Sequence, residues 1–257
     1  MGTTAEGTRV LVTAGAAGIG LAIARAFMAE GAAVYVCDID EGALGKLPST
    51  APGVKAGRCD MGDRAAIGPM VEAAVAALGG LDVLVNNAGI GGPTAPVETL
   101  APDDWDAVLR VNLTSMFDTS RLAIPHLRRS SRGAIVNLSS VAGRFGYANR
   151  AAYATSKWGV IGFTKSLSIE LGPAGIRVNA ILPGTVEGPR IDRVLQGRAS
   201  LTGRTLEEER RLAMLNQSIP EMVGAADVAA LAVYLASAAG KAISGQAISI
   251  DNDMQRL

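Results

Sequence analysis

The sequence predicts an α/β protein built on a parallel, doubly wound sheet. Short apolar stretches typical of strands alternate with longer stretches of helical periodicity along most of the 257 residues. The first apolar stretch is followed by a glycine-rich turn and a helix, and the second ends in an acid. Regular alternation of this kind is typical of βαβ units, in which each helix connects one parallel strand to the next.

The expected strands are short and bounded by turn residues. They are residues 8–13, 33–38, 53–59, 81–86, 133–139, 176–181 and 246–250. The expected helices run from the glycine turn to Glu30, and over residues 63–78, 102–129, 151–171 and 225–237. Asn112 falls inside the third of these helices, and because asparagine is a poor helix former its presence there requires a reason.

The chain carries no internal repeat, linker or low-complexity tract, so residues 1–257 are expected to form a single dinucleotide-binding oxidoreductase domain. Residues 1–7 are small and polar, and we expect them to be disordered. Residues 185–220 are rich in charges and follow a predicted strand. Insertions at the carboxyl ends of such strands usually form part of the ligand crevice, so this segment is expected to be a substrate lid.

Composition excludes several classes of function. Hydrophobic residues make up 49% of the chain, charged residues 19%, and the formal net charge is zero, which gives no argument for nucleic acid or an anionic membrane as partner. No apolar run is long enough to span a membrane, and the N-terminus lacks the apolar core of a signal peptide. Two cysteines fit a reducing cytoplasm, and with a single histidine they predict no metal site.

Residues 140–157 carry the clearest chemical pattern. Ser140 follows a predicted strand, and Tyr153 and Lys157 lie four residues apart on the next helix, which puts both side chains on one face. A nearby ammonium lowers the pKa of a phenol from its usual value of about 10. The pattern predicts an acid/base site for an alcohol or carbonyl, although a helix that buries a tyrosine and exposes a lysine gives the same spacing.

Two features predict a dinucleotide site. A turn between a strand and a helix places backbone N–H groups against a pyrophosphate, and its candidate contacts are Gly15, Gly18, Ile19 and Gly20. Asp38 ends the second strand, where an acid accepts the ribose hydroxyls of NAD and repels the 2′-phosphate of NADP. Neither the turn nor Ile39 supplies a compensating cation, which predicts NAD. Glycines that only turn the chain, and an ordinary turn aspartate, remain the alternatives.

Taken together, these motifs resemble the short-chain dehydrogenase/reductase family, in its short, single-domain branch. The resemblance covers residues 8–251, and the order and spacing of its motifs are very specific. The motifs that carry it are Gly18-Ile19-Gly20, Asp60, Asn86-Asn87-Ala88-Gly89, Asn112, Ser140, Tyr153 with Lys157, and Pro183-Gly184.

The resemblance implies a Rossmann-type sheet of seven parallel strands, a homotetramer, and an NAD-dependent oxidoreductase. Its substrate would be a secondary alcohol or ketone, such as a polyol, sugar, hydroxy acid or cyclic alcohol. Tyr153 would be the general acid/base, Ser140 would position the substrate oxygen, and Lys157 would bind the nicotinamide ribose. Asn112 would hold a proton-relay water. Further cofactor contacts are expected from Asp60, Met61, Asn87, Ala88, Gly89, Pro183, Gly184 and Val186.

The chain departs from the family pattern at two places. The turn begins Thr13-Ala14 rather than Thr-Gly, so we expect a slightly altered turn, and Gly188 stands where the family often has a threonine that touches the cofactor. Two other functions remain open. They are a non-catalytic dinucleotide-binding sensor or scaffold, and a dehydratase or epimerase, although relatives of the latter classes are generally longer.

Four arginines fall in segments expected to line the rim of the pocket. They are Arg144, Arg150, Arg190 and Arg193. One or two of them are candidates to bind a carboxylate, sulfonate or phosphate on the substrate. The alternative is that they are solvated or paired with neighbours such as Glu187 and Asp192.

Overall fold

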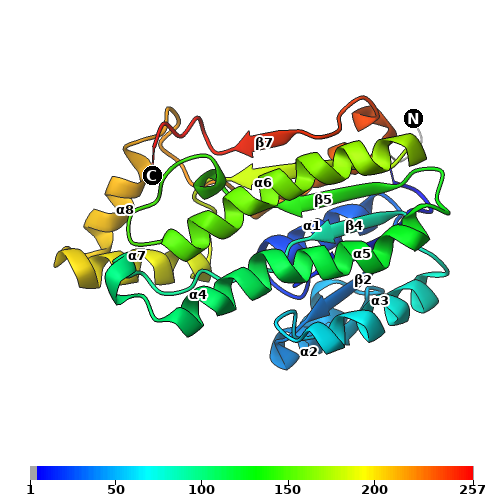
Figure 1. Cartoon of the computed structure of the whole chain (residues 1–257), viewed down its shortest axis with the longest axis horizontal. Helices are drawn as coiled ribbons and strands as arrows, with labels where there is room; N and C mark the ends of the chain where they lie inside the picture. The colour runs from blue at the N-terminus through cyan, green and yellow to red at the C-terminus, as the bar shows by residue number, and fades with distance from the viewer. Residues whose placement is uncertain (1–4, 257) are drawn as a thin grey trace.

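The strands form one parallel sheet, as predicted. A computed structural model describes residues 5–256, in which the sheet has seven strands in the order β3-β2-β1-β4-β5-β6-β7. Their bounds are β1 (Arg9–Thr13), β2 (Ala33–Asp38), β3 (Lys55–Arg58), β4 (Val83–Asn86), β5 (Ala134–Leu138), β6 (Arg177–Pro183) and β7 (Ala247–Ile250). Figure 1 shows the strands side by side, with their carboxyl ends at one edge.

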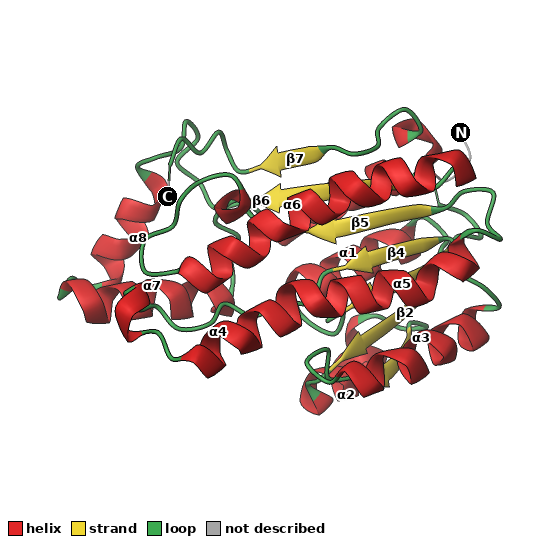
Figure 2. Ribbon diagram, in the orientation of Figure 1, coloured by secondary structure: helices red, strands yellow, loops and turns green. Residues whose placement is uncertain are grey.

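Helices cover both faces of the sheet (Figure 2). One face carries α1 (Gly18–Ala29), α2 (Glu41–Thr50) and α9 (Ala225–Ala236), and the other carries α3 (Arg64–Leu78), α5 (Ser115–Leu127) and α6 (Ala151–Leu171). Successive strand residues point to opposite faces, so Val10 and Val12 pack with α1 while Leu11 packs with α3. Strands buried on both sides are continuously apolar, which is why they were readable in the sequence.

Three further helices lie beyond the carboxyl ends of the strands. They are α4 (Pro102–Leu109), α7 (Pro189–Thr202) and α8 (Leu206–Met214), and Figure 1 shows them past the arrowheads. The last two belong to the segment expected to be a lid. None of the helices within residues 5–256 combines the length and apolarity needed to span a membrane.

The helix expected over residues 102–129 contains an irregular segment. Residues Arg110–Thr114 form a π-helical turn between α4 and α5, and Asn112 lies inside it. Such turns are rare and occur frequently at functional sites. The helical span expected over residues 102–129 is therefore continuous from Pro102 to Leu127, but it departs from α-helical geometry around Asn112.

Helix α2 was missed because its sequence contains Gly42, Gly45 and Pro48. Its start is fixed instead by Asp40, whose Oδ1 accepts a hydrogen bond from the N–H of Ala43 at 3.0 Å.

The N-terminal expectation also changes. Residues 1–4 lie outside the described part of the chain, but residues 5–7 are ordered: Ala5 is buried, and the N–H of Gly7 donates to the carbonyl of Gly31 at 3.1 Å.

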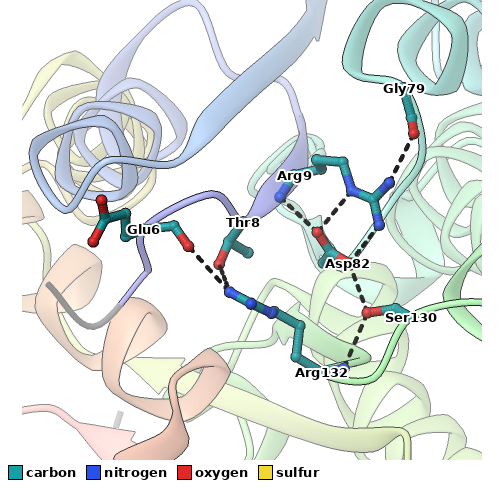
Figure 3. A network of polar contacts seen from close by, with 7 residues as sticks. All are labelled: Glu6, Thr8, Arg9, Gly79, Asp82, Ser130 and Arg132. Atoms are coloured by element: carbon teal, nitrogen blue, oxygen red, sulfur yellow. Dashed lines mark hydrogen bonds and ion pairs between the residues drawn. The ribbon is translucent and has the colours of Figure 1, made fainter. Parts of the chain in front are cut away.

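A polar network lies at the amino end of the sheet, opposite the strand ends that form the site (Figure 3). Asp82 is buried there, and Arg9 donates to its carboxylate from Nε, Nη2 and its own backbone N–H at 2.8, 2.8 and 2.9 Å. The hydroxyl of Ser130 donates to Asp82 at 2.6 Å. Burial raises the pKa of Asp82, but the hydrogen bonds from Arg9 and Ser130 outweigh it and hold that pKa at about 2.

We expect Asp82→Asn to lower the free energy of unfolding at pH 7 by about 2 kcal/mol. The pKa of Asp82 is depressed on folding, so its contribution is present above the unfolded value of about 3.9 and is lost as the pH falls through the folded value of about 2. Urea denaturation at pH 7 measures the difference, with Asp106→Asn on the exposed side of α4 as control. Equal stability of the two variants would contradict the assignment.

Candidate active site

The carboxyl ends of β1 and β4 meet where the strand order reverses, which is the usual ligand crevice of a doubly wound sheet. The hydroxyl of Thr13 accepts hydrogen bonds from the N–H groups of Asn87 and Ala88, both at 3.0 Å. The amide of Asn87 donates to the carbonyls of Thr13 and Ala14 at 3.0 and 2.9 Å. The turns after the two strands are thus joined, and the predicted residues Asn87 and Ala88 lie beside the glycine-rich turn.

The glycines of that turn have different roles. A Cβ on Gly15 would lie 2.6 Å from Cβ of Val36, and one on Gly20 would lie 2.1 Å from the carbonyl oxygen of Ala14, so both positions allow close backbone packing. Gly18 has φ +53° and open space around it. Helix α1 begins here without a side-chain cap, which leaves its first N–H groups able to bind an anion.

Ala14 has φ 50°, in the left-handed region that favours glycine. The turn is therefore altered, as expected from the sequence, and it is strained. Alanine stands where the family has glycine, but the backbone keeps the left-handed conformation that suits glycine.

We expect Ala14→Gly to raise the free energy of unfolding by about 0.5–1 kcal/mol. The left-handed conformation costs an L-residue about 1–2 kcal/mol, and the extra freedom of glycine in the unfolded chain returns part of that gain. Urea denaturation measures it, with Ala16→Gly as the control that should destabilise, because Ala16 is buried and lacks a positive φ. A less stable Ala14→Gly protein would show that Ala14 is not strained.

Asp38 lies directly beside this turn. Its Oδ2 accepts from the N–H of Ala16 at 3.0 Å and its Oδ1 from the N–H of Asp40 at 3.1 Å. Each oxygen keeps a lone pair for a ribose hydroxyl. Ile39 is 53% exposed and lies next to it in the sequence.

One cation near Asp38 was missed. Arg58 of β3 pairs in register with Asp38 of β2, and its Nε forms an ion pair with Glu41 at 2.9 Å. Arg58 lies in neither the glycine turn nor the position after the acid, and a single sequence does not show the register of two strands. Because Arg58 already pairs with Glu41, its attraction for the 2′-phosphate of NADP is reduced.

Asp60 and Met61 follow β3. The Oδ1 of Asp60 accepts from the N–H of Gly62 at 2.7 Å, which shapes the turn. Met61 is buried, contacts the thiol of Cys37, and lines a cavity of about 320 Å³ between α3 and α5. The structure thus places both residues along the same edge of the sheet as Asp38.

Ser140, Tyr153 and Lys157 come together as the spacing predicts. The Nζ of Lys157 donates to the carbonyl of Leu138 at 2.8 Å, and the hydroxyl of Ser139 donates to the backbone carbonyl of Lys157 at 2.8 Å, so α6 is fixed to the end of β5. The Nζ of Lys157 lies 5.8 Å from the centroid of the Tyr153 ring. The hydroxyl of Ser140 accepts from the N–H of Ala142 at 3.1 Å and is half-buried.

The charges around Tyr153 favour its anion. Burial raises the pKa of Tyr153. The positive charges of Arg190 and Lys157 and a hydrogen bond from Ser140 lower it by more, so the net pKa lies below its usual value. Burial also lowers the pKa of Lys157 to about 8, against the opposing effect of the Tyr153 charge. A phenol with a lowered pKa beside an amine with a pKa of about 8 forms a coupled pair suited to proton transfer.

The reason for Asn112 inside a helix is now visible. Its Oδ1 accepts from the N–H of Ile90 at 2.7 Å, and its Nδ2 donates to the carbonyl of Ile90 and the hydroxyl of Ser156, both at 3.0 Å. A Cβ on Gly89 would lie 3.2 Å from Oδ1 of Asn112 and 3.5 Å from Nζ of Lys157. Asn112 therefore ties the loop after β4 to α6 next to the lysine.

The remaining predicted cofactor residues lie at the end of β6. Pro183 is its last residue, and the N–H of Gly184 donates to the carbonyl of Ile250 at 3.0 Å. Val186 forms an isolated bridge with Val223. Gly188 has φ +132° and precedes Pro189 at the start of α7, so a threonine would be strained there. The backbone conformation accounts for this departure from the family pattern.

Two of the four predicted arginines reach the site. The guanidinium of Arg150 lies 5.2 Å from the centroid of the Tyr153 ring, and that of Arg190 lies 5.8 Å from it. Arg144 lies against Phe145 and Ser249 instead, and Arg193 is exposed.

Arg198 was missed. Its guanidinium lies 4.9 Å from the centroid of the Tyr147 ring and donates to the Tyr147 hydroxyl at 2.7 Å. It follows Arg190 by eight residues, a helical spacing that could have indicated a shared face of α7.

The family model described as short chain dehydrogenase matches residues 8–198. The chain belongs to the short-chain dehydrogenase family. The D-beta-hydroxybutyrate dehydrogenase of Cupriavidus necator is 36% identical to this short-chain dehydrogenase over 96% of the chain and 97% of that protein. The 3-oxoacyl-[acyl-carrier-protein] reductase of Thermotoga maritima is 37% identical over 97% of the chain and 98% of that protein.

Solved structures of similar fold carry different cofactors. NAD+-bound xylitol dehydrogenase matches this short-chain dehydrogenase with a TM-score of 0.90 and 29% identity, covering 96% of this chain and 98% of that one. A variant of actinorhodin polyketide ketoreductase with NADPH matches with a TM-score of 0.89 and 34% identity, covering 95% of each chain. The choice of cofactor in this chain thus has to be argued from its own residues.

Proposed function

We propose that this short-chain dehydrogenase is an NAD-dependent oxidoreductase that transfers a hydride between a secondary alcohol and the nicotinamide, with Tyr153 as general acid/base. The observation that carries the proposal is the placement of Lys157, fixed to the end of β5, with its Nζ 5.8 Å from the centroid of the Tyr153 ring. Against its burial, the charges of Arg190 and Lys157 and a hydrogen bond from Ser140 lower the pKa of Tyr153. A sensor or scaffold that only binds the dinucleotide has no need of such a tyrosine.

Each residue has a separate role in the proposal. The hydroxyl of Ser140 holds the substrate oxygen, and Tyr153 takes the proton from that oxygen as the alcohol is oxidised. The ammonium of Lys157 stabilises the phenolate and binds the nicotinamide ribose, while Asn112 keeps the lysine surroundings in place and holds a proton-relay water. A bound NAD would supply the acceptor for the hydride that leaves the carbinol carbon.

The residues present fit a dinucleotide. The uncapped N-terminus of α1 and the open space at Gly18 suit a pyrophosphate. The carboxylate of Asp38 suits the adenosine ribose, with Ile39, Asp60 and Met61 towards the adenine. We assign the remaining contacts to Gly15, Ile19, Gly20, Asn87, Ala88, Gly89, Pro183, Gly184 and Val186.

The proposal includes one functional domain, with residues 185–220 as lid, and a cytoplasmic location. The thiols of Cys37 and Cys59 are both free and buried, which suits a reducing compartment. Within residues 5–256 no group of three or more His, Cys, Asp or Glu side chains is placed to hold a metal ion.

An oxidation screen tests the function. Polyols, sugars, hydroxy acids and cyclic alcohols are offered with NAD and with NADP, and formation of the reduced nicotinamide is followed by its absorbance. We expect NADH to form with at least one secondary alcohol. A protein that binds NADH but oxidises none of them would support the sensor instead.

We also propose a homotetramer. Helices α5 and α6 lie side by side, and large apolar side chains remain exposed along them: Phe117 at 46%, Trp158 at 52% and Ile169 at 78%. Phe117 packs edge-on against Phe163, with ring centroids 6.5 Å apart. An exposed apolar face of this kind is typical of a protein–protein interface.

We expect Trp158→Glu to lower the assembled mass, because it places a charge in the proposed apolar interface. Light scattering of the parent should give the mass of four 26.3-kDa chains, and of the variant a smaller one. Tyr234→Glu is the matched control, since Tyr234 is 46% exposed but lies on α9. A monomeric parent at micromolar concentration would refute the tetramer.

A further inference from the structure

Three guanidinium groups surround two tyrosine rings at the mouth of the site. Tyr147 and Tyr153 pack edge-on with centroids 6.5 Å apart. Arg150 lies 5.6 Å from the centroid of the Tyr147 ring and 5.2 Å from that of Tyr153, while Arg190 and Arg198 lie over one ring each. Positive charge is thus concentrated beside the group assigned to proton transfer.

No protein acid neutralises this cluster within the described residues. Throughout residues 5–256, no carboxylate lies within ion-pair distance of Arg150, Arg190 or Arg198. Two acids of the lid pair with other arginines: Asp192 with Arg210 at 2.6 Å, and Glu209 with Arg204 at 3.4 Å.

Arg150 is the most unusual member. The residue is only 5% exposed, and its Nε is buried without a hydrogen-bond partner. Its Nη1 donates long hydrogen bonds to the carbonyl of Gly92 at 3.3 Å and to the hydroxyl of Thr94 at 3.2 Å. Burying a charge without a counter-charge is costly. An anionic ligand would offset that cost.

A small cavity of about 40 Å³ is lined by two members of the cluster, Tyr147 and Arg198. Arg198, Asn216 and Arg256 give it polar walls, and Ile191, Leu212 and Met254 give it apolar ones. No acid lines it within the described part of the chain. Space of this size suits a carboxylate, whose flat shape matches the donor fork of an arginine.

We propose that the substrate is a short hydroxy acid, with its hydroxyl at Ser140 and Tyr153 and its carboxylate bound by Arg190 and Arg198. The inference rests on the proposed function and names the substrate class of that site. Arg150 adds positive charge from the buried side, and Tyr147 holds Arg198 in place through the hydrogen bond to its hydroxyl. The Tyr147 ring that Arg198 contacts lies 6.5 Å from the Tyr153 ring, which puts the carboxylate within a few bonds of the carbon that is oxidised.

Matched pairs of substrates test the charge directly. The acids 2-hydroxybutyrate, 3-hydroxybutyrate and 4-hydroxypentanoate are each compared with the amide of the same acid, which keeps shape but removes the charge. We expect at least one acid to exceed its amide about 30-fold in kcat/KM. Amides oxidised as efficiently as acids would overturn the inference while leaving the oxidoreductase function intact.

Variants of α7 identify the arginine responsible. Arg198→Gln should reduce the preference for acid over amide about 10- to 100-fold, and Arg198→Lys should restore part of it. Arg193→Gln, on the same helix but exposed, should keep the preference of the parent. An unchanged preference in a folded Arg198→Gln protein would remove Arg198 from the carboxylate site and overturn the proposal.

Binding gives a readout that does not depend on turnover. The thermal midpoint of the protein with NADH is measured with each acid and each amide at millimolar concentration. We expect the acids alone to raise it, and Arg198→Gln to abolish the rise. If no alcohol is oxidised, the proposed function fails. An equal rise of the thermal midpoint with acids and amides would overturn the substrate class, whatever the result of the oxidation assay.

Discussion

Tyr153→Phe should lower the rate of hydride transfer by about 10²–10⁴-fold while the protein still binds NADH. Phenylalanine keeps the ring and its contact with Tyr147 but removes the oxygen that exchanges the proton. Single-turnover kinetics measure the effect on the chemical step, because slow product release can hide it in the steady state.

The pH profile adds a second expectation. The pKa of Tyr153 is lowered because Arg190, Lys157 and Ser140 outweigh its burial, so alcohol oxidation should rise with pH and reach its plateau below the usual titration of a phenol near 10. Lys157, with a pKa of about 8, titrates in the same range, so the inflections belong to the pair.

Tyr234→Phe, on the exposed side of α9, removes a hydroxyl far from this pair and serves as control. A Tyr153→Phe protein within about threefold of the parent rate in a single turnover would reject the assignment, because loss of a general acid/base costs far more. An unchanged pH profile in that variant would lead to the same conclusion.

The inner strands were predictable because they are buried on both faces and therefore continuously apolar, as in β1, β4 and β5. The chemical residues were predictable for a related reason: Ser140, Tyr153 and Lys157 are close in the sequence, and one strand, one loop and one helix suffice to bring them together. Helical spacing alone places the tyrosine and lysine on one face.

What escaped prediction depends on contacts between distant segments. Arg58 lies beside Asp38 only because β3 pairs with β2 in that register. Arg198 reaches Tyr147 across 51 residues. The π-helical turn at Asn112 is fixed by hydrogen bonds to Ile90, 22 residues earlier. In each case a residue distant in the sequence decides a local feature, and a pattern read along one sequence does not show which distant residue that is.

Asp38 should make the enzyme prefer NAD over NADP by at least about tenfold in kcat/KM. A carboxylate about 4 Å from a phosphate charge costs up to about 4 kcal/mol at an effective dielectric of 20. A quarter of that for each of the two phosphate charges leaves about 2 kcal/mol, a factor of about 30. Arg58 offsets little of this repulsion, because its guanidinium is already paired with Glu41 at 2.9 Å.

Asp38→Ala should lose the preference, but it also removes the acceptor for the N–H of Ala16. Asp38→Asn is the cleaner variant, because it keeps an oxygen for that N–H and removes only the charge. Asp40→Asn is the matched control: it removes a charge two residues away and keeps an oxygen able to cap α2.

The ion pair of Arg58 allows a sharper test. Glu41→Gln leaves Arg58 without its acid, so added to Asp38→Asn it should shift the ratio further towards NADP, whose 2′-phosphate the freed guanidinium can bind. Steady-state kcat/KM with both cofactors, measured on one alcohol, gives the NAD/NADP ratio for the parent and for each variant. Equal efficiency with NAD and NADP in the parent would show that Asp38 does not face the ribose. A preference for NAD that persists in Asp38→Asn would assign the discrimination to another residue. In that variant the carboxylate charge is absent, while the hydrogen bond from the N–H of Ala16 is kept.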